Sequence, residues 1–221
     1  DVTSAIRYER KVLTESVPSP EEPTLQSHAV VKNRHHQIIV VGTGAGGAVV
    51  GAELAKAGFD VAFIESGVLH SAENFLEPPL ETLRKTYRDG GLSIAYGRPN
   101  IPLPQGETVG GSTTINSGTC FRIPKYVSEK FEQAQIGLNL EVLSPHYDAV
   151  EQRLGVQPVA PKLLGGSSSV IAKGATSLGL EHGPFNRNIR GCAQSGQCAF
   201  GCPRAAKQAM HLTYLPDALA H

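Results

Sequence analysis

The sequence predicts an α/β fold, and three observations near its first third predict it. Residues 38–41 read Ile-Ile-Val-Val, a continuous β-branched run typical of a buried parallel strand. A glycine-rich segment, 42–47, follows directly and opens a helical pattern over 48–56. A second apolar run at 61–64 ends at Glu65. Strand, glycine turn, helix, strand and acid therefore follow one another within one compact unit.

Composition narrows the class of protein. The chain of 221 residues has 20 Lys plus Arg and 20 Asp plus Glu, so its formal net charge is zero and predicts no nucleic-acid partner. Charged residues make up 18% and apolar residues 40%, which excludes wholesale disorder. No apolar run reaches the roughly 18 residues that a transmembrane helix needs. The sequence indicates no particular compartment.

The first glycine cluster has the spacing of a dinucleotide-binding motif. In Gly42-x-Gly44-x-x-Gly47 the first glycine allows a tight turn, the second lets a pyrophosphate approach the backbone, and the third allows close packing of helix on strand. Gly46 belongs to the same run, at a helix start whose free N–H groups favour phosphate. Glu65 can accept hydrogen bonds from ribose hydroxyls and would repel a 2′-phosphate. The motif alone does not separate NAD from FAD.

Local patterns predict the later elements with less detail. Apolar residues at intervals of four, three and four predict an amphipathic helix that ends at Leu154, with Ser144 as its N-cap and Pro145 at its first position. The other expectations are a helix over 80–87, a glycine cluster over 106–118, a loop over 157–166, a helix over 169–178, and a helical or extended piece over 205–219.

The second glycine cluster carries the shape Gly-x3-Gly-Gly-Ser-x3-Asn-x-Gly-x3-Arg, from Gly106 to Arg122. A Gly-Gly-Ser turn that opens a helix presents free N–H groups to phosphate, ribityl or flavin carbonyl oxygens. At these residues the sequence resembles the glucose–methanol–choline family of flavoprotein oxidoreductases, whose first signature looks like this stretch. The resemblance covers roughly residues 38–219 and extends to the Glu65-Ser66-Gly67 segment.

Two further motifs carry the same resemblance. The stretch from Leu143-Ser144-Pro145-His146-Tyr147 to Leu154-Gly155-Val156 is similar to the family's next segment. The stretch from Cys202-Pro203-Arg204 to Leu215-Pro216-Asp217-Ala218 is similar to the branch that contains sugar, polyol, sterol and long-chain-alcohol oxidoreductases. All four motifs occur in the family's order.

The resemblance implies a Rossmann-like FAD-binding domain, incomplete in this chain, followed by the start of a substrate or cap domain. The implied divisions are an N-terminal arm (1–37), an FAD-binding region (38–122), a cap segment (123–190) and a cysteine-rich segment that returns to the FAD domain (191–221). Noncovalent FAD would be held at its pyrophosphate and ribose by Gly42, Gly44, Gly46, Gly47 and Glu65. On the flavin side it would be held by Gly110, Gly111, Ser112, Asn116 and Gly118.

The implied activity is oxidation of a CH–OH group in an alcohol, sugar, polyol or sterol, with hydride transfer to flavin N5. Members of the family are usually more than twice as long, and their catalytic His lies near the C-terminus. The resemblance therefore places the catalytic base outside this chain. It argues against four histidines of this chain as the base, His146, His182, His211 and His221. The open sheet is expected to be completed by further residues of the same polypeptide or by a second chain.

Three cysteines form the remaining motif, Cys192-x5-Cys198-x3-Cys202-Pro203. A Cys-Pro pair after an x3 gap is typical of iron–sulfur ligation, and three thiolates suit a 3Fe–4S cluster. Heterooligomeric sugar dehydrogenases of the family carry such a cluster with similar spacing, but have a further cysteine where this chain has Ala193. A disulfide, free thiols and zinc with a histidine are the alternatives from the residues alone.

A cluster next to the flavin would pass electrons singly to a haem or other acceptor subunit. Two other functions fit parts of the sequence. A non-catalytic flavin or cluster electron-transfer subunit fits the absence of a base. An NAD-dependent dehydrogenase explains the first glycine motif, but neither the second cluster nor the cysteines.

Overall fold

The structure, a computed structural model, describes residues 35–137 and 139–221. Most of the expected N-terminal arm, residues 1–34, lies outside the described residues. In the part of the chain that is described, no helix is both long and apolar enough to cross a membrane.

A parallel β-α-β unit opens the fold, as the sequence predicts. β1 (Ile38–Val41) pairs with β2 (Val61–Ile64) in parallel, and α1 (Ala45–Lys56) connects them. Both strands have the predicted bounds. The helix begins three residues before the expected start at Ala48, because the Ala48 N–H already donates to the Gly44 carbonyl at 3.0 Å. The glycine run is therefore the first turn of α1 and the turn that precedes it.

The remaining elements are short. In chain order they are the 3-10 helix η2 (Ala72–Leu76), α2 (Pro79–Thr86), η3 (Arg88–Gly91), the antiparallel pair β3 (Ile94–Ala95) and β4 (Ile101–Pro102), α3 (Ser112–Ile115), α4 (Lys125–Gln133), α5 (Leu140–Leu154), β5 (Val156–Pro158), η4 (Pro161–Leu163), α6 (Gly166–Ser177), β6 (Asn186–Asn188), η5 (Met210–Leu212) and α7 (Tyr214–Leu219). The helices predicted over 80–87 and 169–178 correspond to α2 and α6, with starts one and three residues earlier.

Two expectations in the cap segment are wrong. Ser144 does not cap α5, because the Asn139 side-chain oxygen accepts the Glu141 N–H at 2.7 Å and starts the helix earlier, which leaves Pro145 inside it. The stretch 157–166 is not all loop, since β5 pairs antiparallel with β6 and η4 follows. Both errors arise because the deciding partner, Asn139 in one case and β6 in the other, lies outside the sequence pattern from which the element was predicted.

The core lies where α1 meets α7. Its buried members are Ala48, Ala52, Leu154, Met210, Tyr214 and Leu215. A small residue on α1 also permits its close approach to β2, since a Cβ on Gly51 would lie 2.2 Å from the Phe63 ring. Arg153 at the end of α5 donates to both carboxylate oxygens of Asp217 at 2.6 and 2.7 Å, which fixes α5 to α7. The C-terminal residues thus complete a core that the β-α-β unit begins.

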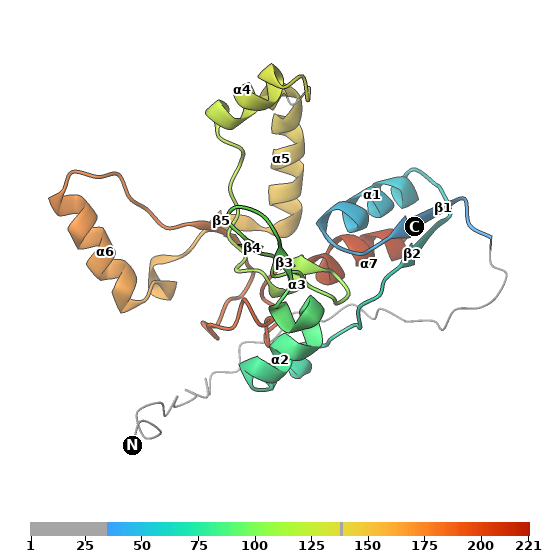
Figure 1. Cartoon of the computed structure of the whole chain (residues 1–221), viewed down its shortest axis with the longest axis horizontal. Helices are drawn as coiled ribbons and strands as arrows, with labels where there is room; N and C mark the ends of the chain where they lie inside the picture. Colours follow the sequence, from blue (N-terminus) through green and yellow to red (C-terminus); the bar gives the residue numbers. More distant parts are fainter. Residues whose placement is uncertain (1–34, 138) are drawn as a thin grey trace.

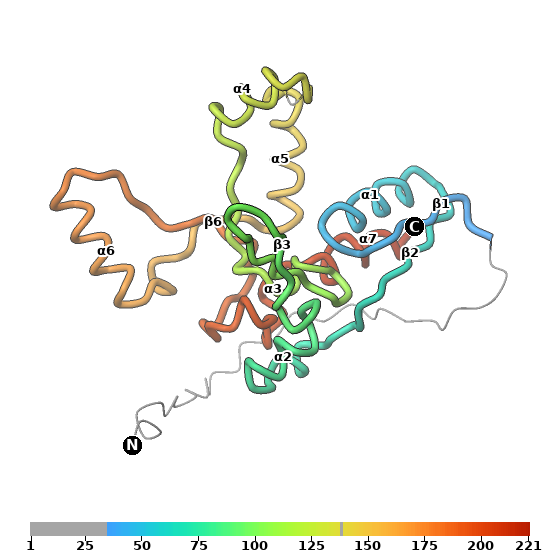
Figure 2. The backbone as a smooth tube through the Cα atoms, in the orientation of Figure 1, coloured from blue at the N-terminus to red at the C-terminus, as the bar shows by residue number. Residues whose placement is uncertain are grey.

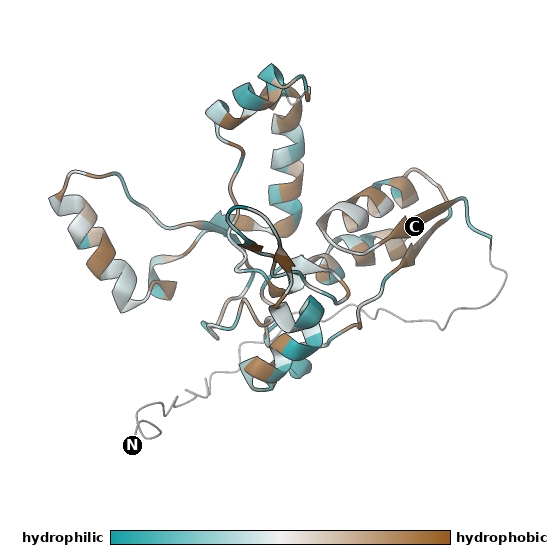
Figure 3. Ribbon diagram, viewed as in Figure 1, coloured by the Kyte–Doolittle hydropathy of each residue, from teal (hydrophilic) through white to brown (hydrophobic). Residues whose placement is uncertain are grey.

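Other parts of the molecule extend away from this core. Figure 1 shows the α4–α5 pair and α6 projecting in different directions, and Figure 2 traces the chain out to α6 and back. None of the α6 residues is buried. The strands β1 and β2 are among the most hydrophobic segments in Figure 3, yet Ile39, Val41 and Ile64 are 57, 81 and 56% exposed. One face of the small sheet is therefore uncovered in the described residues.

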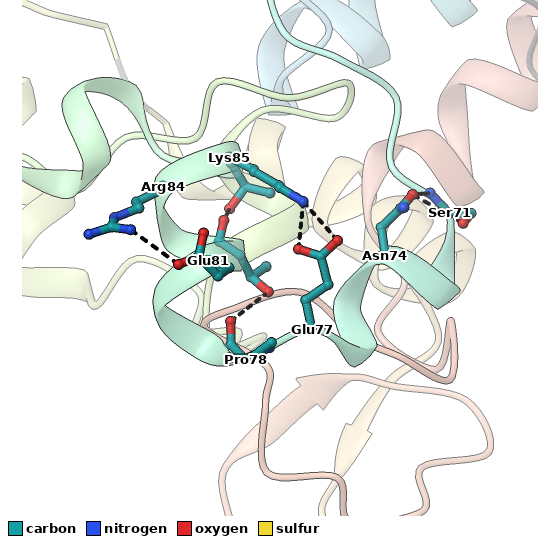
Figure 4. Close-up of polar contacts among 9 residues, drawn as sticks. Ser71, Asn74, Glu77, Pro78, Glu81, Arg84 and Lys85 are labelled. Carbon is teal, nitrogen blue, oxygen red and sulfur yellow. Dashed lines mark hydrogen bonds and ion pairs between the residues drawn. The ribbon is translucent and has the colours of Figure 1, made fainter.

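The region around α2 supports the second glycine cluster. Figure 4 shows its polar contacts, including the Lys85–Glu77 ion pair at 2.6 Å and the Ser71–Asn74 cap of η2. At the end of α2 the Thr86 carbonyl accepts the Glu107 N–H at 2.7 Å. After β2, the Val68 carbonyl accepts the Val109 N–H at 3.1 Å. The chain before and after α2 is thereby joined to the start of the cluster.

Adjacent glycines in α1 provide a matched test of this packing. A Cβ on Gly47 would lie 2.1 Å from the Gly42 carbonyl oxygen, whereas a Cβ on Gly46 meets nothing within 4 Å. We expect Gly47→Ala to lower the free energy of unfolding by about 2–3 kcal/mol through overpacking against backbone. Gly46→Ala should raise the free energy of unfolding by no more than about 1 kcal/mol, because alanine has a higher helix propensity than glycine. Urea titration measures both, and equal effects of the two substitutions would contradict the packing described.

Candidate functional site

The first glycine turn ends at an open helix start. Gly42 has φ of 92°, a conformation that favours glycine, and its N–H donates to the Ile64 carbonyl at 2.7 Å. Gly44 is the N-cap of α1, where no side chain bonds the first N–H groups and no acidic residue stands in the first turn. Cβ atoms on Gly42, Gly44 and Gly46 would meet nothing within 4 Å. The turn therefore presents free amides and space to an anionic group.

Glu65 lies beside this turn at the end of β2. Its Oε2 accepts from the Thr43 N–H at 2.8 Å and from the Thr43 hydroxyl at 2.6 Å, and its Oε1 accepts from the Gly67 N–H at 2.8 Å. Burial raises the pKa of Glu65, but these hydrogen bonds outweigh burial and hold the pKa below its ordinary value. The carboxylate is therefore ionised at neutral pH, in a fixed orientation.

The second glycine cluster packs directly against the first. The Gly110 N–H donates to the Thr43 hydroxyl oxygen at 2.9 Å. Gly111 has φ of 54°, and a Cβ there would lie 2.9 Å from the Gly44 Cα. The structure thus brings Gly42, Gly44, Gly46, Gly47, Glu65, Gly110 and Gly111 into one neighbourhood. Thr43, which sequence reasoning did not select, is the residue that joins them.

The other predicted residues of this cluster make contacts of their own. The Ser112 hydroxyl accepts the Gly106 N–H at 3.0 Å and closes its own loop. Asn116 and Gly118 lie beyond α3, where the Asn116 side chain accepts the Gly118 N–H at 3.0 Å. A Cβ on Gly118 would lie 2.8 Å from the Asn188 side-chain oxygen. Asn116 and Gly118 therefore face the cysteine-rich segment, at the end of α3 away from Gly111.

Two buried side chains of the C-terminal segment, Lys207 and His211, pack against the second glycine cluster. Lys207 is 2% exposed, and its ammonium donates to the carbonyls of Asn116 at 2.5 Å and Cys198 at 2.6 Å. Burial lowers the pKa of Lys207 to about 8. His211 lies 3.2 Å from the Thr114 hydroxyl, and burial, with Lys207 nearby, lowers its pKa to about 4. His211 is thus neutral at pH 7 and packs under the Gly110 turn.

Lys207 was also missed, because its neighbours Ala206 and Gln208 give no signal of an enclosed charge and a lysine is almost never fully buried. Of the other histidines, His182 bonds the Thr176 hydroxyl on α6 at 2.9 Å, away from the glycine turns.

The three cysteines of the C-terminal motif line one cavity of about 500 Å³. All four cysteines of the chain are free thiols in this structure, and Cys198 Sγ accepts from the Arg187 guanidinium at 2.9 Å. Within residues 35–137 and 139–221, no group of three Cys, His, Asp or Glu side chains is arranged to hold a metal ion. The donor types suit an iron–sulfur cluster, but their arrangement here does not fit one. Cys120, outside the motif, is half-buried, and burial raises the pKa of its thiol.

Comparison with known proteins decides the family. The family model for GMC oxidoreductases matches residues 83–221, more than half of the chain. The chain belongs to the GMC oxidoreductase family. This confirms the family resemblance on which the sequence predictions of cofactor and reaction rest.

Relatives of the GMC chain include oxidoreductases from bacteria and plants. An uncharacterized GMC-type oxidoreductase of Mycobacterium tuberculosis is 41% identical over 82% of this chain and 29% of its own length. A long-chain-alcohol oxidase of Arabidopsis thaliana is 32% identical over 81% of this chain and 25% of its own length. A cholesterol oxidase of Acinetobacter baumannii is 23% identical over 84% of this chain and 38% of its own length. The chain thus spans less than two fifths of each of these relatives.

The Thr43 hydroxyl provides a direct test of the joined glycine turns. Thr43→Val keeps the shape of the side chain but leaves the Gly110 N–H without its partner and removes one of the two hydrogen bonds that Glu65 Oε2 accepts from Thr43. We expect a loss of about 2 kcal/mol in the free energy of unfolding, because buried polar groups without partners are costly. Thr43→Ser, which keeps the hydroxyl, should lose less than about 1 kcal/mol. Denaturant titration distinguishes these outcomes, and a Val variant as stable as the Ser variant would refute the role of the hydroxyl.

Proposed function

We propose that this chain forms the FAD-binding part of an oxidoreductase that acts on the CH–OH group of an alcohol. The observation that carries the proposal is the pair of glycine turns joined through Thr43 at the open start of α1. The free amides of the first turn, and the empty Cβ positions at Gly42, Gly44 and Gly46, suit a pyrophosphate that approaches the backbone closely. Membership of the GMC family supports a flavin in place of a nicotinamide cofactor.

Each part of the site has a separate task in this proposal. The Gly42, Gly44 and Gly46 positions would admit the pyrophosphate, and the ionised Glu65 would accept hydrogen bonds from the adenosine ribose. The bond from the Ser66 hydroxyl to Glu65, at 3.4 Å, is the weakest that this carboxylate receives, so a ribose hydroxyl would replace it. A 2′-phosphate would be repelled there. Gly110 and Gly111 would approach the cofactor from the opposite turn.

FAD bound here would supply the two-electron acceptor, with the substrate hydride going to flavin N5. Lys207 and His211 hold the second glycine cluster in place from beneath, and His211, being buried and neutral, is not offered as the base. The base would come from outside this chain, as would most of the substrate pocket. Long-chain or sterol alcohols are the substrates we propose, because the named relatives include a long-chain-alcohol oxidase and a cholesterol oxidase.

The proposal also includes a partner for the exposed sheet face and a path for electrons. The rest of the enzyme, in the same polypeptide or a second chain, would cover the exposed face of β1 and β2. A relay through a 3Fe–4S cluster at Cys192, Cys198 and Cys202 stays a prediction of the sequence. No step is assigned to it, because the thiols do not surround a common point in the described residues.

Anaerobic mixing of the purified native protein with alcohols tests the proposed reaction. We expect a long-chain primary alcohol or a sterol to bleach the visible flavin band, without added nicotinamide cofactor. Reduction by dithionite but by no alcohol would contradict the enzyme function and favour an electron-transfer subunit. Alcohol-dependent reduction of added NAD⁺ would contradict FAD as the hydride acceptor.

A pair of glutamates separates the binding role of the site from general effects of charge. Glu65→Gln should weaken FAD binding about tenfold or more, because a hydrogen bond to a charged acceptor contributes roughly 1.5–3 kcal/mol. Glu53→Gln removes the same charge from the exposed face of α1, where Glu53 forms an ion pair with Lys56, and should leave FAD binding unchanged. Equal losses in the two variants would contradict the placement of the ribose at Glu65.

A further inference from the structure

A second site lies in the cavity of the cysteine-rich segment. This cavity, about 500 Å³, is bordered by the chain around η4, by β6 and by residues 192–207. Its volume falls within the range of small-molecule sites. The glycine turns that carry the proposed function are not among the lining residues.

The charge of the lining is its distinctive property. Four cationic side chains border the cavity, from Lys162, Arg187, Arg204 and Lys207, and the lining contains no Asp or Glu. None of these four cations forms an ion pair with a carboxylate in the described part of the chain. The chain as a whole has equal numbers of acidic and basic residues, so the absence of acids here is a local feature.

Two of these cations are held in ways that leave them without a countercharge. The Lys207 ammonium is enclosed, and it donates hydrogen bonds to two neutral carbonyls. Arg187 donates from one terminal nitrogen to Cys198 Sγ at 2.9 Å and to the Ser117 carbonyl, while its Nε is buried with no hydrogen-bond partner. Burying positive charge without a compensating anion is expensive, so such a cavity favours an anion that enters it.

We propose that this cavity binds a small oxyanion, a carboxylate or a phosphate group. Guanidinium and ammonium groups are the side chains that bind both oxyanions, arginine by paired N–H groups and lysine as a point charge. The Arg187 guanidinium and the enclosed Lys207 ammonium provide the interior charge. Lys162 is exposed and stands nearer solvent, where it attracts anions toward the cavity.

Cys198, which contacts Arg187, reports whether the cavity attracts anions. Iodoacetate and iodoacetamide alkylate thiols by the same displacement of iodide, but only iodoacetate is an anion. The rate ratio of the two reagents at one cysteine therefore reports the local attraction for an anion, independent of how reactive that thiol is. Cys120 lies outside the cavity lining and serves as the internal reference. The same ratio at Cys198 in the urea-unfolded protein is a second reference.

The experiment uses the full chain, with alkylation at each cysteine followed by peptide mass spectrometry. We expect the iodoacetate-to-iodoacetamide ratio at Cys198 to exceed that at Cys120 about tenfold, since clefts lined by one sign of charge concentrate the opposite ion to at least this extent. Lys162→Gln and Arg204→Gln should each lower the ratio severalfold. Lys173→Gln, the same change on α6 outside the cavity, should leave it unaltered.

Competition identifies the oxyanion. Inorganic phosphate, sodium acetate and sodium chloride are added at equal ionic strength during alkylation of Cys198. Stronger protection by phosphate than by chloride assigns a phosphate site, and stronger protection by acetate assigns a carboxylate site. Equal protection by all three salts, or equal reagent ratios at Cys198 and Cys120, would overturn the proposal. None of these readouts depends on flavin or on turnover, so the proposed function can fail without affecting them.

Discussion

The hydroxyl of Thr43 is the contact on which the candidate site depends. It donates to Glu65 at the end of β2 and accepts from the Gly110 N–H, so one oxygen connects the first glycine turn, the acid and the second glycine turn. The residue is 4% exposed, and water cannot easily take over either bond. Positions 43, 65 and 110 are far apart in the chain, and their meeting creates a cradle that no single segment contains.

Lys207 provides a second connection of the same kind. Its ammonium donates to a carbonyl from the second glycine cluster and to a carbonyl from the cysteine-rich segment, and so connects the two. On one side of this connection lies the glycine cradle, with free amides and a single ionised carboxylate. On the other lies a cavity whose charged side chains are all cationic. The fold thus offers anions two environments, one built from backbone and one built from side-chain charge.

The sequence predicts well what local chemistry determines. The strand bounds at 38–41 and 61–64 follow from β-branched runs, and the glycine spacing predicts the turn between them. Prediction from the sequence failed where a distant or flanking residue determines the structure. Asn139, not Ser144, starts α5, and β5 forms only because residues 186–188 return to pair with it. Thr43 and Lys207 were missed for the same reason, since their roles exist only once separate segments meet.

The cradle formed by the joined glycine turns is the central claim, and its occupant is the most direct test. The measurement is the amount of FAD released per chain when the folded native protein is denatured and its flavin is separated from the polypeptide. We expect one noncovalent FAD per chain. A folded native protein that contains no flavin, and takes up none when FAD is added, would contradict it.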